Sequence, residues 1–326
     1  MNNFEHADAT SVEEAIGLLG LKGNSLPIAG GTDLLTQIKL GIIKPDRVVN
    51  LKTIPGLDLI TSRDNGLYIG AIANLDTIAN NQVVREQYPA LIKAIEVIAS
   101  PQLRNSGTIG GNLAQGPRCW YYRGEFHCWM KQGERCYARV GENSHHAIFG
   151  GGRCNQVHPS DLAPVLIALG AEIIIEGIRG QRTLPLADLF QLPQSGSRQL
   201  TILNSDEIIT MIRLPVPIPG TKGTYLKAMD RKVWAFALAS VAVQLVLEKG
   251  KIRDARIVLG GVAPMPWRLL KTEELLRNQK INISLITEAA EVAVEGAQPL
   301  SCNLYKIALV KGILTEALSS ILKTLQ

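Results

Sequence analysis

Two features that mark many exported and membrane proteins are missing from this sequence. The amino-terminal residues, MNNFEHADATSVEEA, have neither the positively charged start nor the apolar run of a secretory signal peptide. The longest apolar stretch, residues 234–247, is interrupted by Ser240 and Gln244 and is too short to cross a bilayer. We therefore expect no membrane span and a cytoplasmic location, unless a partner that bears an export signal carries the chain with it.

Clustered charge is also missing. Charged residues make up 19% of the 326 positions and the formal net charge is +5, but Lys and Arg are scattered along the chain. A nucleic-acid-binding surface needs a basic stripe, so we expect no nucleic-acid partner. With 46% hydrophobic residues, the chain is long enough for two or three packed domains.

Cysteine is scarce, and its distribution is uneven. Four of the five cysteines lie between residues 119 and 154, in a segment without strand or helix periodicity. Cytoplasmic thiols stay reduced, so metal ligands or redox groups are more plausible here than disulfides. The spacing has no CxxC pair; taken alone it fits zinc, an iron-sulfur cluster or free thiols, with His127, His145 and His146 as competing ligands. The fifth, Cys302, is expected to be a buried apolar residue.

The pattern of apolar residues and turns divides the chain into three segments. Residues 1–57 read as an α/β unit: a helix from Ser11 to Gly20, a strand, a glycine turn, a helix stopped at Gly41 and a second strand. Residues 58–218 predict strands and helices with an insertion at 115–157 that holds the cysteines. After a Pro- and Gly-rich linker, residues 219–326 predict a sheet with a hairpin at 248–251 and a terminal helix.

Two glycine-rich segments are candidates for binding a pyrophosphate. In PIAGGTDLL, residues 27–35, a strand leads into Gly30 and Gly31 and then into a helix, so backbone amides can turn toward an anion. Asp33 can equally cap that helix, and a plain tight turn remains an alternative. The second segment, GTIGGNLAQG at 107–116, repeats the device. A dinucleotide held between two such loops is the functional interpretation.

Several motifs together carry a family resemblance. The motifs that carry this resemblance are, in order, AGGTDLL, TIGGN, HPSDLAPVLIALGA, YLKAMDRKVWAFALASVAV and LGGVAPMPWR. With them, the chain resembles the flavoprotein subunit of the molybdenum hydroxylases, the xanthine dehydrogenase and aldehyde oxidoreductase family. The resemblance implies an α+β fold, with a two-part FAD-binding domain of the PCMH type and a smaller C-terminal domain of antiparallel sheet packed with helices. It spans nearly the whole chain.

The resemblance also implies which residues bind FAD. The first glycine segment would wrap the pyrophosphate through Pro27, Ile28, Ala29, Gly30, Gly31, Thr32, Asp33 and Leu34. The second would do so from the other side through Thr108, Ile109, Gly110, Gly111 and Asn112. Asp161 would bond the adenosine part, with Ile209 and Lys227 nearer the flavin. Alternatively, Asp161 only caps the helix that follows it.

One branch of this family has an insertion of the same kind, which implies a [4Fe-4S] cluster. Aldehyde oxidoreductases of periplasmic type and 4-hydroxybenzoyl-CoA reductase belong to this branch. Nearby aromatic residues would shield the site or simply pack under the loop: Trp120, Tyr121, Tyr122, Trp129 and Tyr137. The four thiolates that a cubane needs would come from Cys119, Cys128, Cys136 and Cys154, with eight, seven and seventeen residues between successive members.

The implied function is electron transfer within a heteromeric molybdenum hydroxylase that acts on aldehydes or heteroaromatic compounds. Its partners would be a molybdopterin-binding large subunit and a [2Fe-2S] small subunit, and electrons would pass between the iron-sulfur clusters and a small-molecule or protein acceptor through FAD. The alternatives are the beta subunit of a hydroxybenzoyl-CoA reductase and a zinc-stabilised nucleotide-binding assembly protein.

Overall fold

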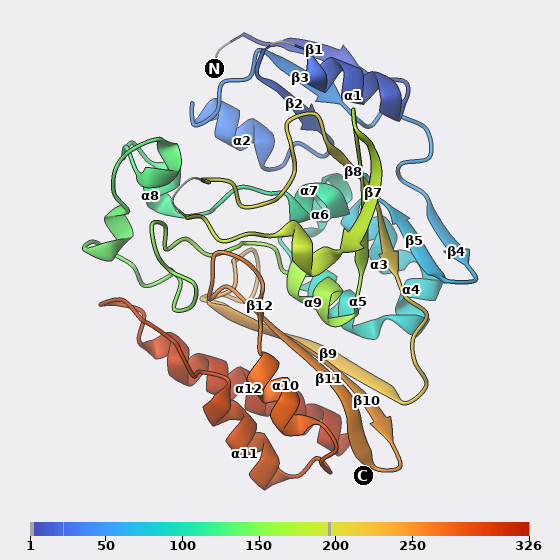
Figure 1. Ribbon diagram of the computed structural model, residues 1–326, viewed down its shortest axis with the longest axis vertical. Coiled ribbons are helices and arrows are strands. Elements are labelled where there is room, and N and C mark those ends of the chain that lie inside the picture. Colours follow the sequence, from blue (N-terminus) through green and yellow to red (C-terminus); the bar gives the residue numbers. More distant parts are fainter. Residues whose placement is uncertain (1–2, 22, 195–196, 326) are drawn as a thin grey trace.

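The computed structural model describes residues 3–21, 23–194 and 197–325, and in this part of the chain helices accompany three separate β-sheets (Figure 1). The α+β class is therefore confirmed. One sheet falls within each of the three segments expected from the sequence, while the domain boundaries themselves stay a prediction.

The first sheet is parallel, with the order β1-β3-β2. Ser11 caps the first helix, because its Oγ accepts from the backbone N–H of Glu14 at 3.1 Å. Gly41, with φ +67°, follows the second helix, as expected. The elements are β1 (Glu5–Asp8), α1 (Val12–Gly20), β2 (Ser25–Ile28), α2 (Leu34–Lys39) and β3 (Arg47–Asn50).

The second sheet is antiparallel, with the order β4-β5-β8-β6-β7. Its strands are β4 (Ile60–Arg63), β5 (Gly66–Gly70), β6 (Glu172–Gly177), β7 (Gly180–Pro185) and β8 (Ile208–Leu214). Every residue of α9 is buried, so this helix lies inside the main core. The accompanying helices are α3 (Leu75–Asn80), α4 (Gln82–Gln87), α5 (Pro89–Glu96), α6 (Pro101–Ser106), α7 (Ile109–Leu113), α9 (Leu162–Ala168) and η3 (Leu186–Leu189).

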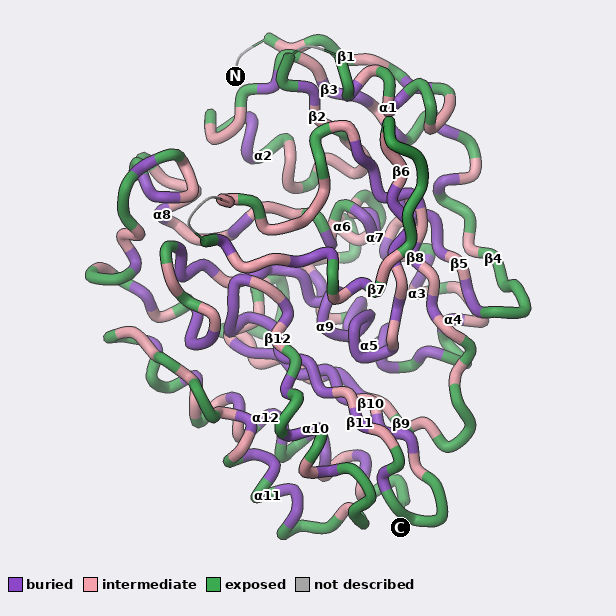
Figure 2. The backbone as a smooth tube through the Cα atoms, in the orientation of Figure 1, coloured by how far each residue is buried: buried purple, intermediate pink, exposed green. Residues whose placement is uncertain are grey.

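The C-terminal sheet is antiparallel, with the order β12-β11-β10-β9. The predicted hairpin is confirmed, and Lys249 and Gly250 both have positive φ, as a type I′ turn requires. Strand β10 contacts both α9 and α12, so this strand is buried along most of its length (Figure 2). The elements are β9 (Thr221–Ala228), β10 (Ala239–Glu248), β11 (Lys251–Gly260), β12 (Trp267–Arg268), α10 (Leu270–Leu276), α11 (Ile283–Val292) and α12 (Tyr305–Lys323).

The cysteine-rich insertion lies between α7 and α9 and consists of turns and short helices: α8 (Trp120–Arg123), η1 (Trp129–Lys131) and η2 (Tyr137–Arg139). Figure 1 shows it at the side of the molecule, below α2 and above the start of the C-terminal helices. Within the described residues, no helix combines the length and apolarity needed to span a membrane.

Candidate functional site

The loop between β2 and α2 presents a row of backbone donors. The N–H groups of residues 30–33 have no hydrogen-bond partner among the described residues. Gly31 adopts φ +67°, a left-handed conformation that glycine reaches without steric penalty. Successive unpaired amides in such a turn form a concave site for an anion. The first glycine segment therefore has backbone donors that are free within the described part of the chain, while its contact with a pyrophosphate stays a prediction.

The two glycine segments lie in direct backbone contact. A Cβ at Gly30 would stand 2.8 Å from the carbonyl carbon of Ser106 and overlap its oxygen. Gly110 packs in the same way, because a Cβ there would meet the carbonyl oxygen of Ala71 at 2.9 Å. Both glycines are therefore needed for packing of protein against protein. The contact of Gly110 with a pyrophosphate stays a prediction.

The second glycine segment uses most of its amides within the protein. Ile109 donates to the carbonyl of Ala73 at 3.0 Å, and Gly110 donates to that of Ala71 at 2.9 Å. Thr108 caps α7, because its Oγ1 accepts a hydrogen bond from the Gly111 N–H at 3.2 Å. Its carbonyl oxygen accepts from the N–H of residue 112. A ligand contact from this segment must come from other atoms. The FAD contacts of residues 108–112 stay a prediction.

Asp161 and Lys227 are brought together in the interior. The Lys227 ammonium lies 2.7 Å from one carboxylate oxygen of Asp161, and the Tyr225 hydroxyl donates to the other oxygen at 2.7 Å. Burial raises the pKa of Asp161, while Lys227 opposes this shift. Asp161 does not cap α9; the Ser160 hydroxyl accepts from Ala163 instead, so the capping alternative is wrong.

Ile209 lies in β8 with its side chain in the main core, 7% exposed. Its place near a flavin, and that of Asp161 near adenosine, stay predictions. The same holds for Pro27 and its neighbours at the end of β2.

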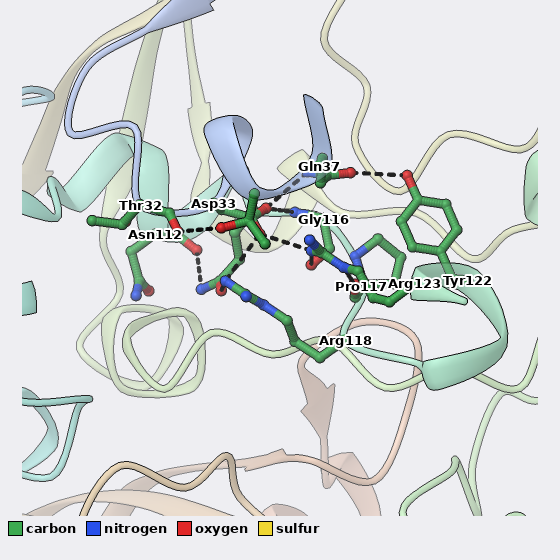
Figure 3. Close-up of polar contacts among 11 residues, drawn as sticks. Thr32, Asp33, Gln37, Asn112, Gly116, Pro117, Arg118, Tyr122 and Arg123 are labelled. Atoms are coloured by element: carbon green, nitrogen blue, oxygen red, sulfur yellow. Dashed lines mark hydrogen bonds and ion pairs between the residues drawn. The ribbon is translucent and has the colours of Figure 1, made fainter. Parts of the chain in front are cut away.

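Asp33 connects the first glycine segment to the insertion (Figure 3). Its Oδ1 accepts from the guanidinium of Arg123 at 2.7 Å and pairs with Arg118 at 3.0 Å. Its Oδ2 accepts from the Gly116 N–H at 2.8 Å and from the Gln37 amide at 2.9 Å. The carboxylate makes no capping bond to its own helix. Sequence reasoning did not identify either arginine.

The four clustered cysteines lie close together, and their role as metal ligands stays a prediction. Cys128 and Cys154 are buried, whereas the other two are half-buried. All four line one small cavity, which they share with aromatic side chains from Tyr121, Tyr122, Trp129 and Tyr137. Trp120 packs edge-on against His146 instead, with ring centroids 5.1 Å apart. Four of the five expected aromatic residues thus surround the thiols.

The local environment affects each thiol differently. Burial raises the pKa of Cys119 to about 11. The pKa of Cys136 falls to about 5, because the Cys154 thiol and the Asn155 amide stabilise its thiolate. The pKa of Cys154 shifts upward, because the thiolate of Cys136 holds its proton and because it is buried. A bound cation would favour all four thiolates, which are the form that coordinates metal.

Among the three histidines considered as ligands, His146 lies nearest the thiols. Its Nε2 is 3.2 Å from the Cys119 sulfur, and burial lowers its pKa to about 4. His127 is exposed, and His145 is exposed with its Nε2 2.9 Å from Asp230. No group of three or more His, Cys, Asp or Glu side chains within the described ranges is arranged around a single metal-ion position.

Cys302 corrects one expectation, because it is exposed rather than buried. Its backbone N–H donates to the side-chain oxygen of Asn143 at 2.8 Å. Asn143 is fully buried and also donates to Ser301 at 3.0 Å, so it attaches the insertion to the C-terminal segment.

The fold and the amide-lined loop together define the class of an α+β dinucleotide-binding protein. Two family models cover most of the chain: the FAD binding domain in molybdopterin dehydrogenase over residues 2–217, and the CO dehydrogenase flavoprotein C-terminal domain over residues 224–321. The chain belongs to the family of FAD-binding subunits of molybdopterin-dependent dehydrogenases. It is an oxidoreductase subunit, and FAD is its cofactor.

Curated relatives and solved structures agree with this assignment. The aldehyde oxidoreductase FAD-binding subunit PaoB of Escherichia coli is 34% identical, with 95% of each chain covered. The glyceraldehyde dehydrogenase medium chain of Sulfolobus acidocaldarius is 28% identical, over 91% of this chain and 89% of the relative. A structure of carbon monoxide dehydrogenase from Hydrogenophaga pseudoflava matches with a TM-score of 0.77 and 27% identity, over 98% of this chain and 96% of that one.

Proposed function

We propose that this chain is the electron-transfer subunit of a heteromeric molybdenum hydroxylase that oxidises aldehydes, and that it holds a [4Fe-4S] cluster in addition to FAD. The convergence of four cysteine side chains on one cavity carries the cluster assignment. The aldehyde assignment is supported by two relatives whose names refer to aldehyde oxidation. A heteroaromatic substrate is the next candidate, because a nicotine 6-hydroxylase medium subunit is also similar, at 29% identity.

The residues around the first glycine loop fit the pyrophosphate of FAD. The unpaired amides of residues 30–33 supply neutral donors. Beside them, Arg118 Nε and Arg123 Nη1 are buried and have no partner among the described residues. A phosphate oxygen can satisfy such donors, since guanidinium groups bind phosphate well. We therefore assign these amides and the two arginines to the phosphate side of the flavin site.

We favour a cluster over a single zinc ion at the thiol cavity, because the insertion resembles that of the family branch with a [4Fe-4S] cluster. A zinc ion holds four sulfurs at about 2.3 Å from one point, so the sulfurs must crowd together. A cubane binds each thiolate at a different iron and accepts a wider arrangement. Four cysteines line the same cavity, which is the number of thiolates that a cubane needs. Family membership also argues against a zinc-stabilised assembly protein without redox activity.

FAD supplies exchange between two-electron and one-electron carriers when it is bound. The residues of this chain would bind and orient it: the amides of residues 30–33 would hold the phosphates, and the paired Asp161 and Lys227 would lie near the adenosine and the flavin. The aromatic side chains around the thiols would exclude water from the cluster. Substrate chemistry would occur on a molybdopterin-binding large subunit, with a [2Fe-2S] small subunit between the two. A small-molecule or protein acceptor would then take electrons from the flavin.

Electron counting tests this proposal. The full chain, purified anaerobically and oxidised, should take up about three electrons per FAD from dithionite, two for the flavin and one for the cluster. It should hydroxylate no aldehyde by itself. Uptake of only two electrons, without any iron-sulfur absorbance, would refute the assignment of a cluster. Aldehyde turnover by the chain alone would refute the proposal that substrate oxidation occurs on a partner subunit. The alternative is the beta subunit of a hydroxybenzoyl-CoA reductase. Reduction of a hydroxybenzoyl-CoA substrate by the assembled complex would support this alternative. The cytoplasmic location also stays a prediction.

A further inference from the structure

Asp33 belongs to the first glycine segment, but its carboxylate is directed at the insertion. Its side chain is only 12% exposed, and those of Arg118 and Arg123 are 27% and 13% exposed. A largely covered carboxylate between two guanidinium groups is held in one arrangement, because removing any member leaves a poorly compensated charge. The conformation of the loop and that of the insertion therefore depend on the same contacts (Figure 3).

The contacts extend from Asp33 to both candidate cofactor sites. Arg118 donates to the Gln115 side chain at 3.1 Å, and Gln115 donates to the carbonyl of Asn112 in the second glycine segment at 2.9 Å. In the other direction, Gln37 accepts from the Tyr122 hydroxyl at 3.0 Å. Tyr122 lines the thiol cavity. One connected set of polar contacts thus joins the phosphate-binding loop to the wall of the thiol cavity.

The covalent connection is equally short. Arg118 directly precedes Cys119, and Arg123 ends α8. A shift of the first cysteine therefore moves a guanidinium that binds Asp33, and a shift of Asp33 moves the segment that presents the thiol. The ordered conformation of the glycine loop and that of the insertion therefore stabilise each other. By thermodynamic linkage, the effect of the first site on the second equals the effect of the second on the first.

We propose that Asp33 is a positioning residue that couples the flavin site to the thiol site, so that each site binds its cofactor more tightly when the other is filled. The inference rests on the proposed function of both sites. It also changes the expected consequence of losing the cluster. From the sequence, FAD binding should largely survive removal of a cysteine, whereas the Asp33 contacts predict a reciprocal loss.

A thermodynamic cycle tests the coupling. FAD affinity is measured by fluorescence titration on four full-length chains: the parent, Cys136→Ser, Asp33→Asn and the double variant. With Asp33 present, Cys136→Ser should weaken FAD binding about tenfold, a typical coupling between sites. In the Asp33→Asn background, the cysteine change should alter FAD affinity less than about twofold. Equal effects of Cys136→Ser in both backgrounds would overturn the proposal.

Asp46→Asn is the matched control. Asp46 lies in the same N-terminal segment, and its Oδ2 accepts from the Asn24 N–H at 2.9 Å, without contact to the insertion. The Asp46→Asn chain should retain the tenfold effect. Loss of coupling in this control as well would show a general destabilisation and contradict the role of Asp33. If Asp33→Asn does not fold, Tyr122→Phe is the substitute, because it removes only the hydroxyl bond to Gln37. Loss of one hydrogen bond should reduce the coupling about threefold. An undiminished coupling in that variant would contradict the proposal.

A second measurement separates this inference from the cluster assignment. Added FAD should slow protease cleavage within residues 119–154 in the parent and in Asp46→Asn, but not in Asp33→Asn. This protection needs no iron. If the chain holds no iron, the cluster proposal fails while the protection still decides on the coupling. Equal protection in all three chains would refute the role of Asp33.

Discussion

Gly30→Ala is a sharp test of how the flavin loop is held in place. The added methyl would stand 2.8 Å from the Ser106 carbonyl carbon and 3.1 Å from the Gly107 Cα, and it would overlap the Ser106 oxygen. All of these atoms are backbone, so no side chain can rotate away. The two glycine segments must separate instead.

The expected loss of stability in Gly30→Ala comes from overpacking alone. Overpacking in a well-packed region costs about 1–3 kcal/mol, and a rigid backbone neighbour favours the upper half of that range. Gly41→Ala is the matched control, because Gly41 has φ +67° and nothing within 4 Å of the added methyl. That variant should lose about 1 kcal/mol from its left-handed conformation alone. Gly30 has no positive φ, so its loss reports packing only.

Urea unfolding followed by far-UV circular dichroism, together with FAD titration, checks this prediction. Gly30→Ala should lower the stability by about 2–3 kcal/mol and weaken FAD at least tenfold, since the amides of residues 30–33 move. Gly41→Ala should bind FAD like the parent. A Gly30→Ala chain whose stability and FAD affinity match the parent would refute the close packing of the two segments.

Two further predictions concern buried ionisable groups. Burial lowers the pKa of His158 to about 4. As the pH falls through about 6.5, this histidine is therefore protonated in the unfolded chain but stays neutral in the folded chain. Stability should therefore fall by about 2 kcal/mol between pH 7 and pH 5 through this residue, and urea midpoints of His158→Asn should show a correspondingly weaker pH dependence. Lys227→Met should destabilise the fold by about 3–5 kcal/mol, because it leaves the Asp161 carboxylate buried without its cation. Adding Asp161→Asn should recover part of that loss, and a double variant no more stable than Lys227→Met would contradict the pairing.

Much of the fold is visible in the sequence because it depends on local signals. The Ser11 cap, the left-handed Gly41 and the hairpin at 248–251 each follow from neighbouring residues. The four clustered thiols line one cavity, but whether they hold a metal stays a prediction.

The contacts of individual site residues could not be predicted, because they join distant parts of the chain. The partners of the Asp33 carboxylate in the insertion, Gly116, Arg118 and Arg123, lie between 83 and 90 positions away. From local sequence, an Asp in a first helical turn reads as a cap or a ligand contact, and the structure gives it a third role. Likewise, the close approach of Gly110 to the backbone of Ala71 joins distant positions, and no local pattern indicates it. Cys302 is exposed, and its backbone bond to Asn143 joins positions 159 residues apart, which no sequence pattern indicates.

Metal analysis of the full chain, purified alone and anaerobically, tests the central claim most directly. The parent should contain about four irons and about four acid-labile sulfides per chain, together with FAD. Cys136→Ser should lose most of the iron, whereas Cys302→Ser should keep it, because that thiol is exposed and outside the cavity. Stoichiometric zinc without labile sulfide in the parent, or equal iron in both variants, would contradict a [4Fe-4S] cluster at these four cysteines.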